Sequence, residues 1–177
     1  MDLVDLIEEK RFLGQEFLTW LWFKSEERGG SINLPDSGDI QVIFEQHMLL
    51  EYGEGESHEK VICQGQQAEL KEAKTGLAMG KKLEQARIRL ARDNHEWRLS
   101  LSGALMQFRS VRVPKTMSPG EEEGDEAARE GLILDRIGLL EMATRTVDEL
   151  FRLYLSIRLN PEWTAERDRI SHWIAKR

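Results

Sequence analysis

The first strong hydrophobic pattern of the chain runs from Phe12 to Arg28 and predicts a helix. This stretch contains no proline. At 100° per residue, six of its large apolar side chains spread over roughly 200° of the helix surface, and Phe12 and Phe23 fall outside that arc. Such a spread allows two interpretations: a helix that is enclosed by the core, or a helix that also docks a partner or a second copy. The residues assigned to a partner interface are Phe12, Trp20, Trp22 and Phe23.

Alternating apolar and polar residues predict strands after the turn-rich connector at 29–39. Ile40 to Tyr52 reads as a β-hairpin with Glu45–His47 as a three-residue loop. Lys60 to Gln66 reads as a further strand, and Ala68 to Met79 as a helix that stops at Gly80. In the first hairpin, we expect Phe44, Val42 and Ile40 to face Met48, Leu50 and Tyr52.

A second hairpin is predicted around a two-residue turn at Asp93-Asn94. The turn pairs Leu90 with Trp97, and the pairing continues outward through Ile88 with Leu99 and Ala86 with Leu101. The same register places four polar residues together on the opposite face: Arg87, Arg89, Arg98 and Ser100. Because like charges directly opposite each other destabilise a sheet, packing alone would not select this arrangement.

The C-terminal third predicts two helices. Gly131 to Leu159 has apolar residues at three- and four-residue spacing, and Asn160-Pro161 separates it from a last helix with Trp163 and Trp173. The near-heptad spacing of the long helix permits a dimer seam or packing on the sheet. The prediction is one α+β domain over 1–177: a helix and an antiparallel sheet of about five strands over 1–115, an acidic loop at 116–130, and helices over 131–177.

Composition places the chain among globular proteins. With 177 residues, 40% hydrophobic and 32% charged, it can bury a core and is not broadly disordered. The N-terminus lacks the pattern of a secretory signal, and no apolar run reaches the 18 to 20 residues that cross a bilayer. A single cysteine, Cys63, suits a reducing compartment. We therefore expect a cytoplasmic protein without membrane contact.

Positive charge is concentrated in one segment of an otherwise acidic chain. Residues 81–115 contain nine Lys or Arg and three acids, a local charge of +6, whereas the whole chain carries −7. A concentrated cationic face indicates a polyanionic partner, with nucleic acid first. The alternative is a solvated sheet face on which arginine stems cover apolar surface. The residues expected to contact nucleic acid are Arg87, Arg89, Arg98, Lys81, Lys82, Arg109, Arg112 and Lys115.

Catalytic and metal-binding motifs are not apparent. Gly76 to Lys82 has the wrong glycine spacing for a phosphate loop and lies at a helix C-terminus, where carbonyls rather than amides are free. The four histidines have no metal-ligand spacing, and the acidic run at 121–126 is typical of a solvated loop. We expect no catalytic residues, metal or cofactor. A metal-dependent nuclease built from dispersed acids, such as Glu45, Glu51 and Asp135, remains a third and weaker interpretation.

Several elements resemble the C-terminal half of the recombination-associated protein RdgC family. The resembling residues are 61–66 (VICQGQ), a helix ending at Gly80-Lys81-Lys82, the strand at 86–90, the hairpin through Trp97 and Leu101, and the basic strand at 108–114. Upstream, 17–21 (FLTWL) is similar to the family's leucine-threonine-x-tryptophan element. Downstream, the acidic loop and the long helix match in kind only, because the family's aspartate- and phenylalanine-rich helix opening is absent.

The resemblance implies a dimeric, nucleoid-associated protein that binds double-stranded DNA with little sequence preference and restrains recombinase filaments. It also implies a ring around DNA, but the family builds that ring with N-terminal regions that this sequence lacks. The expected partners are therefore duplex DNA, a second copy, and a recombinase or another protein. The alternative function is a protein-interaction module that kept the fold but lost DNA contact, with its cations paired to the acidic loop.

Overall fold

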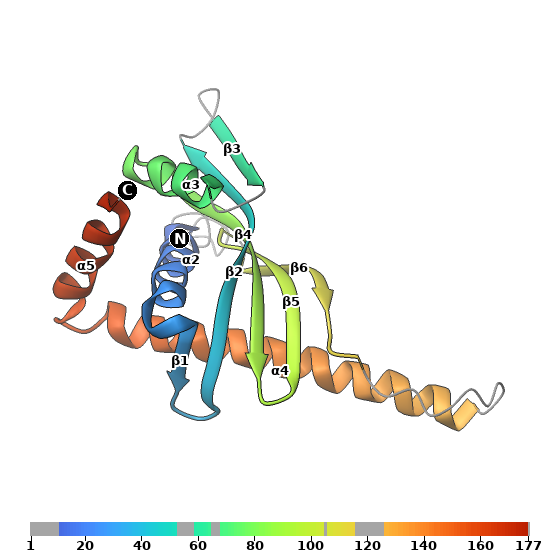
Figure 1. The fold of residues 1–177 in the computed structure, drawn as a ribbon. Helices are drawn as coiled ribbons and strands as arrows, with labels where there is room; N and C mark the ends of the chain where they lie inside the picture. Colours follow the sequence, from blue (N-terminus) through green and yellow to red (C-terminus); the bar gives the residue numbers. More distant parts are fainter. Residues whose placement is uncertain (1–10, 53–58, 65–67, 105, 116–125, 177) are drawn as a thin grey trace, which may run out of the picture.

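The computed structural model describes residues 11–52, 59–64, 68–104, 106–115 and 126–176 and confirms an α+β fold (Figure 1). The helices and strands follow in chain order: α2 (Arg11–Glu26), the 3₁₀ turn η1 (Glu27–Gly30), β1 (Ser31–Leu34), β2 (Gly38–Tyr52), β3 (Glu59–Gln64), α3 (Ala68–Ala78), β4 (Lys82–Arg92), β5 (His95–Ser102), β6 (Gln107–Arg112), α4 (Glu126–Arg158) and α5 (Trp163–Ala175).

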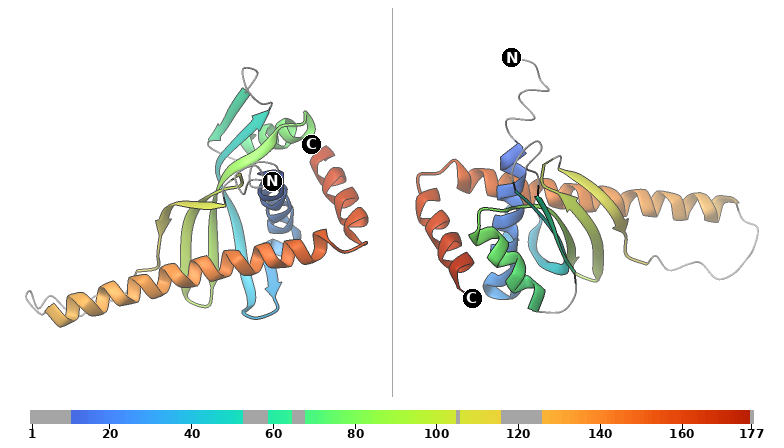
Figure 2. Two further views of the ribbon diagram at one scale, coloured as in Figure 1. Left: turned by 180° about the vertical axis from the view of Figure 1, so that it is seen from behind. Right: turned by 90° about the horizontal axis from the view of Figure 1, so that it is seen from above.

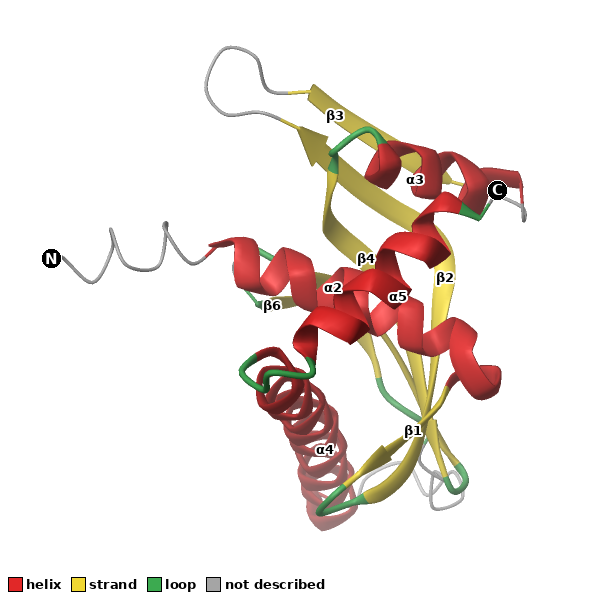
Figure 3. Ribbon diagram, turned by 90° about the vertical axis from the view of Figure 1, so that its left-hand side faces the viewer, coloured by secondary structure: helices red, strands yellow, loops and turns green. Residues whose placement is uncertain are grey.

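One antiparallel sheet of six strands organises the described chain. Its main order is β1-β2-β4-β5-β6, and β3 pairs with the far end of β2. Because β4 pairs along one edge of β2, strands β1 and β3 share its other edge. Figure 1 shows α4 crossing behind the lower parts of β2, β4 and β5, while α3 lies over the upper part of the sheet. Figure 3 shows α4 nearly end-on at one side of the sheet.

The predicted hairpin at Ile40–Tyr52 is wrong, because β2 is one 15-residue strand. Both halves of β2 pair with β4: Phe44 lies opposite Ile88, and Met48 lies opposite Ala86. The residues between, 45–47, form an irregularity in the ladder instead of a loop. A hairpin and an irregular long strand show the same alternation, so the partner strand β4 decides between them.

The second predicted hairpin is confirmed residue for residue. Strands β4 and β5 pair Leu90 with Trp97, Ile88 with Leu99 and Ala86 with Leu101. Asp93 in the turn has φ of 52°, the left-handed conformation that two-residue hairpin turns require. The six apolar residues of these three pairs are all buried.

Helix α2 is a core helix. Trp20, Trp22 and Phe23 are buried, so only Phe12 of the four residues assigned to a partner interface is exposed. Burial of these rings against the sheet, α4 and α5 explains the wide apolar spread of the helix. Helix α2 also approaches the end of β5 closely: a Cβ on Gly14 would lie 1.8 Å from the carbonyl oxygen of Gly103. Only glycine allows this approach.

Helix α4 begins at Glu126, so the predicted acidic loop is shorter at its C-terminal end than 116–130, and residues 116–125 lie outside the described chain. From Leu139 onward it packs on the sheet and on α2 through five buried hydrophobic side chains: Leu139, Ala143, Val147, Leu150 and Tyr154. Its first half extends past the sheet edge (Figures 1 and 2). Within the described chain, no helix is long and apolar enough to cross a bilayer.

Stability should fall above pH 10 because of Tyr154. Its hydroxyl donates to Glu16 Oε2 at 2.9 Å. Burial, followed by the charge of Glu16, raises the pKa of Tyr154 well above its usual value. Above pH 10 the unfolded chain therefore loses this proton while the folded chain keeps it, which favours unfolding. In urea denaturation at pH 9 to 11, Tyr154→Phe should lose stability less steeply than the parent, and equal slopes would contradict the argument.

Candidate nucleic-acid interface

The sheet register aligns five arginines in two neighbouring rows. In one row, Arg89 of β4 lies opposite Arg98 of β5, which lies opposite Arg112 of β6. In the next row, Ser100 lies between Arg87 and Arg109. We call this group the arginine face; it consists of Arg87, Arg89, Arg98, Arg109 and Arg112. The predicted hairpin register aligned Arg87, Arg89 and Arg98. The pairing of β6 with β5 places Arg109 and Arg112 beside them.

The arginine face lies on the side of the sheet that α4 does not cover. Trp97 points toward α4, because its Nε1 donates to the carbonyl oxygen of Leu139 at 2.9 Å. Successive side chains of a strand point to opposite faces, so Arg98 points away from α4. The arginines that are paired with Arg98 and Ser100 across the ladders share this direction. Figure 1 is viewed from the side opposite α4.

Two carboxylates partly neutralise the face within the described chain. Glu96 contacts Arg89 at 3.3 Å and Arg98 at 3.1 Å, and Glu45 approaches Arg98 at 3.6 Å. These exposed pairs relieve the repulsion between Arg89 and Arg98 at little gain in stability. Sequence reasoning did not place either acid beside these arginines, although Glu96 lies only two residues from Arg98.

The other three arginines keep their charge available. Arg87, Arg109 and Arg112 are exposed, and none forms an ion pair with a described residue. With five guanidinium groups and two carboxylates, the face carries a net charge of about +3. In addition, Arg89 Nε is buried without a hydrogen-bond partner among the described atoms. The face therefore presents three exposed arginines and net positive charge to solvent, whereas Arg89 Nε is covered.

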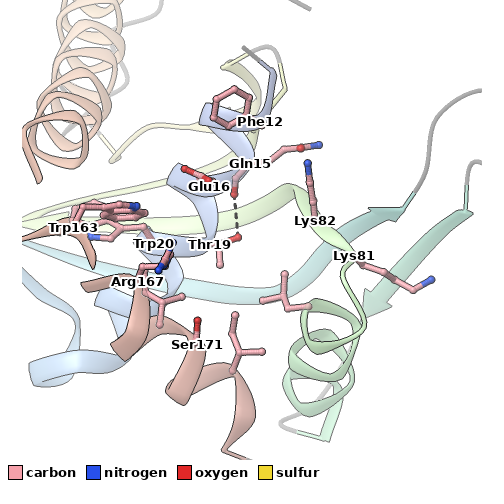
Figure 4. Close-up of a pocket in the computed structure, with 13 residues that line it drawn as sticks. Phe12, Gln15, Glu16, Thr19, Trp20, Lys81, Lys82, Trp163, Arg167 and Ser171 are labelled. Carbon is pink, nitrogen blue, oxygen red and sulfur yellow. Dashed lines mark hydrogen bonds between the residues drawn. The ribbon is translucent and has the colours of Figure 1, made fainter. Parts of the chain in front are cut away.

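Two of the three predicted lysines, Lys81 and Lys82, lie apart from the arginine face. Lys81 pairs with Glu59 at 2.9 Å, and this hydrogen bond lowers the pKa of Glu59. Lys81 and Lys82 line a cavity of about 340 Å³ between α2, α5 and the end of α3 (Figure 4). Lys115 is exposed in the segment after β6. Sequence proximity to the hairpin grouped Lys81 and Lys82 with the arginines, but the path of the chain places both beside the cavity, while the contact of Lys115 with nucleic acid stays a prediction.

The glycines at 76–80 terminate α3 and offer no phosphate site. The amide of Gly80 donates to Leu77 and that of Lys81 to Gly76, both at 3.0 Å, in the pattern of a Schellman cap. Because these amides are used inside the cap, they are not available to an anion. Gly80 has φ of 89°, which favours glycine.

No group of three or more metal-ligating side chains gathers anywhere in the described part of the chain. Glu45 contacts Arg98, Glu51 pairs with Lys60, and Asp135 is exposed on α4. Cys63 is buried in β3, whereas His58 and 121–125 lie outside the described residues. Of the dispersed acids in the nuclease interpretation, Glu45 and Glu51 thus lie six residues apart on β2 and each contacts a different cation, whereas Asp135 lies on α4.

Comparison with known proteins gives no match: no protein-family model, curated protein or solved structure matches this chain.

Proposed function

We propose that this protein binds double-stranded DNA without enzymatic action and with little sequence preference, in a role linked to recombination. The observation that carries the proposal is the arginine face, in which two rows of guanidinium groups lie on an uncovered side of the sheet. The link to recombination rests on the resemblance of these elements to the RdgC family. Under this proposal the site belongs to a nucleoid-associated cytoplasmic protein.

The size of the face suits a few phosphates of one duplex. Neighbouring strands lie about 4.8 Å apart and residues two positions apart lie about 7 Å apart, so the two rows across β4, β5 and β6 cover about 10 by 7 Å at the backbone. Extended arginine side chains widen this area. The major groove of a duplex is about 12 Å wide, so the face matches the backbone around one groove.

The shape of the site favours contacts with DNA phosphates over contacts with base edges. The face lies on a sheet, and neither a described helix nor a described loop projects from it in Figure 1 to enter a groove. Arginine contacts to phosphate oxygens position a protein on DNA but do not specify sequence. We therefore expect similar affinities for unrelated duplexes.

Salt dependence tests the proposal. Three to five phosphate contacts give a slope of about −2.7 to −4.5 in log K against log salt, so affinity should fall about 40- to 500-fold between 50 and 200 mM NaCl. Fluorescence anisotropy with two 20-bp duplexes of unrelated sequence measures both quantities. Absence of binding at 50 mM, or an affinity that salt does not change, would contradict DNA binding through this face.

Removing one carboxylate from the face should strengthen DNA binding. Glu96 contacts both Arg89 and Arg98, so Glu96→Gln releases two guanidinium groups. The substitution also removes a negative charge that repels the DNA phosphates. We expect about 3- to 10-fold tighter binding at 50 mM salt and a steeper salt slope. Glu130→Gln, on exposed α4, makes the same change in net charge away from the face. Equal effects of the two variants would indicate a general charge effect only.

The second candidate is a protein-interaction module. It is favoured by the ion pairs of Arg89 and Arg98 within the chain and by the exposed apolar side chains on the first half of α4. Its partner would be a recombinase or another protein. No detectable DNA binding at 50 mM salt, together with a stable complex with a purified recombinase, would favour this module over DNA binding.

A further inference from the structure

A cavity of about 340 Å³ lies between α2, α5, the end of α3 and the start of β4 (Figure 4). The side chains from α2 lie at positions 12, 15, 16, 19 and 20, and those from α5 at positions 163, 167, 170, 171 and 174, so each helix turns one face toward the cavity. Small-molecule sites have volumes of about 300 to 1,000 Å³. The cavity therefore suits a small organic molecule rather than a folded partner.

The walls of the cavity are largely apolar and aromatic. They are formed by Phe12, Trp20, Leu77, Trp163, Ile170 and Ile174. Two of the rings are held in place by other contacts. Trp20 Nε1 donates to Glu166 Oε1 at 3.2 Å, and the ring of Trp163 packs against that of Tyr154 with centroids 6.0 Å apart. Fixed aromatic rings favour a ligand with a flat apolar body.

Positive charge borders these apolar walls. Among the described residues that line the cavity, the charged ones are Glu16, Lys81, Lys82 and Arg167. Lys82 is exposed and forms no ion pair with a described residue. Arg167 is exposed as well, and the carboxylate of its sequence neighbour Asp168 approaches it only at 3.9 Å. These two cations are available to a bound anion.

The other two charged groups of the cavity are already paired. Lys81 pairs with Glu59 at 2.9 Å and points away from the other labelled side chains in Figure 4. Glu16 Oε2 accepts hydrogen bonds from the hydroxyl of Tyr154 and from Arg158 Nε, both at 2.9 Å. Because this carboxylate, the only one among the described lining residues, is held by a cation, the net charge that a ligand meets is positive.

The donors of the cavity favour a carboxylate over a phosphate. Phosphate sites commonly present several backbone amides to the ligand. The turn at 80–81 uses its amides inside the cap of α3 instead. The donors that remain are separate side chains: Lys82, Arg167 and the hydroxyl of Ser171. A cation and a hydroxyl suit the two oxygens of a carboxylate.

We propose that this cavity binds a small organic acid that has a flat apolar body and one carboxylate group. The apolar body packs between the walls that α2 and α5 provide, and the carboxylate pairs with Lys82 or Arg167. This inference does not depend on DNA binding, because none of the residues that line the cavity belongs to the arginine face.

Titration with 2-naphthoate tests the site, and the neutral 2-naphthalenemethanol is the matched probe without the charge. In an NMR titration of the ¹⁵N-labelled chain, naphthoate should bind with a Kd of about 1 mM or tighter. The neutral probe should bind about 10-fold more weakly, because it lacks a charge-assisted contact. Absence of naphthoate binding at about 5 mM, or equal affinity for the two probes, overturns the proposal.

The indole N–H signals show where the probe binds. The signal of Trp163, in the cavity wall, should shift as naphthoate is added. The signal of Trp97 should stay in place, because this side chain is buried and donates to α4. Trp163→Phe and Trp97→Phe assign the two signals by their loss. Binding that leaves the Trp163 signal unmoved overturns the assignment to this cavity.

Two double variants separate the cavity from a general charge effect. Lys82→Ala/Arg167→Ala should weaken naphthoate binding about 10-fold or more and leave the affinity for the neutral probe unchanged. The control, Arg145→Ala/Arg152→Ala, removes the same charge from exposed positions on α4 and should bind naphthoate like the parent. Circular dichroism checks that each variant keeps the fold. Equal losses of affinity in the two variants overturn the proposal.

A third probe tests the choice of carboxylate. 2-Naphthyl phosphate has the same apolar body and should bind no more tightly than naphthoate. Tighter binding of the phosphate would overturn the assignment of the ligand as a carboxylate.

Discussion

Replacing Arg87, Arg109 and Arg112 together by alanine should weaken duplex binding about 100-fold at 50 mM salt. These are the arginines of the face that no described carboxylate neutralises. A hydrogen bond contributes about 1 kcal/mol net, and every 1.4 kcal/mol corresponds to a factor of ten in affinity, so three lost contacts give about two powers of ten. The salt slope should become shallower by about 2.7, as three phosphate contacts are lost. Fluorescence anisotropy over a salt series measures both effects.

The matched control is Lys71→Ala/Arg145→Ala/Arg152→Ala. These three side chains are exposed on α3 and α4, and their removal changes the net charge by the same amount. If both triple variants lose affinity equally, binding reflects total charge and not the arginine face. Alanine at Arg89 and Arg98 should have a smaller effect, because Glu45 and Glu96 already hold those two guanidinium groups.

Trp97→Ala should lower the free energy of unfolding by about 3 to 5 kcal/mol, the range for loss of a large buried aromatic side chain. Trp97 is 1% exposed, and its Nε1 donates to the carbonyl oxygen of Leu139, so it joins β5 to α4. Trp97→Phe keeps most of the packing and loses the hydrogen bond, which should cost about 1 to 2 kcal/mol. Urea denaturation followed by circular dichroism gives these values.

Met79→Ala is the control for this series, since that side chain is 70% exposed and its removal should change stability by no more than about 0.5 kcal/mol. A loss below 1 kcal/mol for Trp97→Ala would mean that α4 does not pack on β5 as described. Both Trp97 variants leave the charges of the arginine face in place. At temperatures where they remain folded, we therefore expect them to bind DNA like the parent.

The pairing of β4 with β5 could be predicted from the sequence because all of its determinants are local. A two-residue turn fixes which residues face each other, and the period of two then assigns every side chain to one face. Leu90 with Trp97 and Arg89 with Arg98 follow from the turn alone, and the structure confirms both pairs. The end of α3 at Gly80 could be predicted for the same reason, because the residues that form its cap are close together in the sequence.

Contacts between residues far apart in the sequence decided between the alternatives that the sequence pattern allowed. The alternation of Ile40–Tyr52 fits a hairpin as well as one long strand, and only pairing with β4 selects the strand. The aromatic spread of α2 fits a core or an interface, and packing among the sheet, α4 and α5 buries it. The cation count could not show that Arg112 aligns with Arg98, or that Glu45 lies beside them.

The sequence by itself determined the fold class, the β4–β5 register and the common face of Arg87, Arg89 and Arg98, because each follows from spacing within a few residues. The tertiary structure decided which cations share that face, which are neutralised and which half of α4 meets the sheet. The three- and four-residue spacing of apolar residues in α4 continues from Ile133 to Tyr154, yet Val147 is buried while Ile133 is exposed. Burial depends on what lies beside the helix, and spacing along one chain does not contain that information.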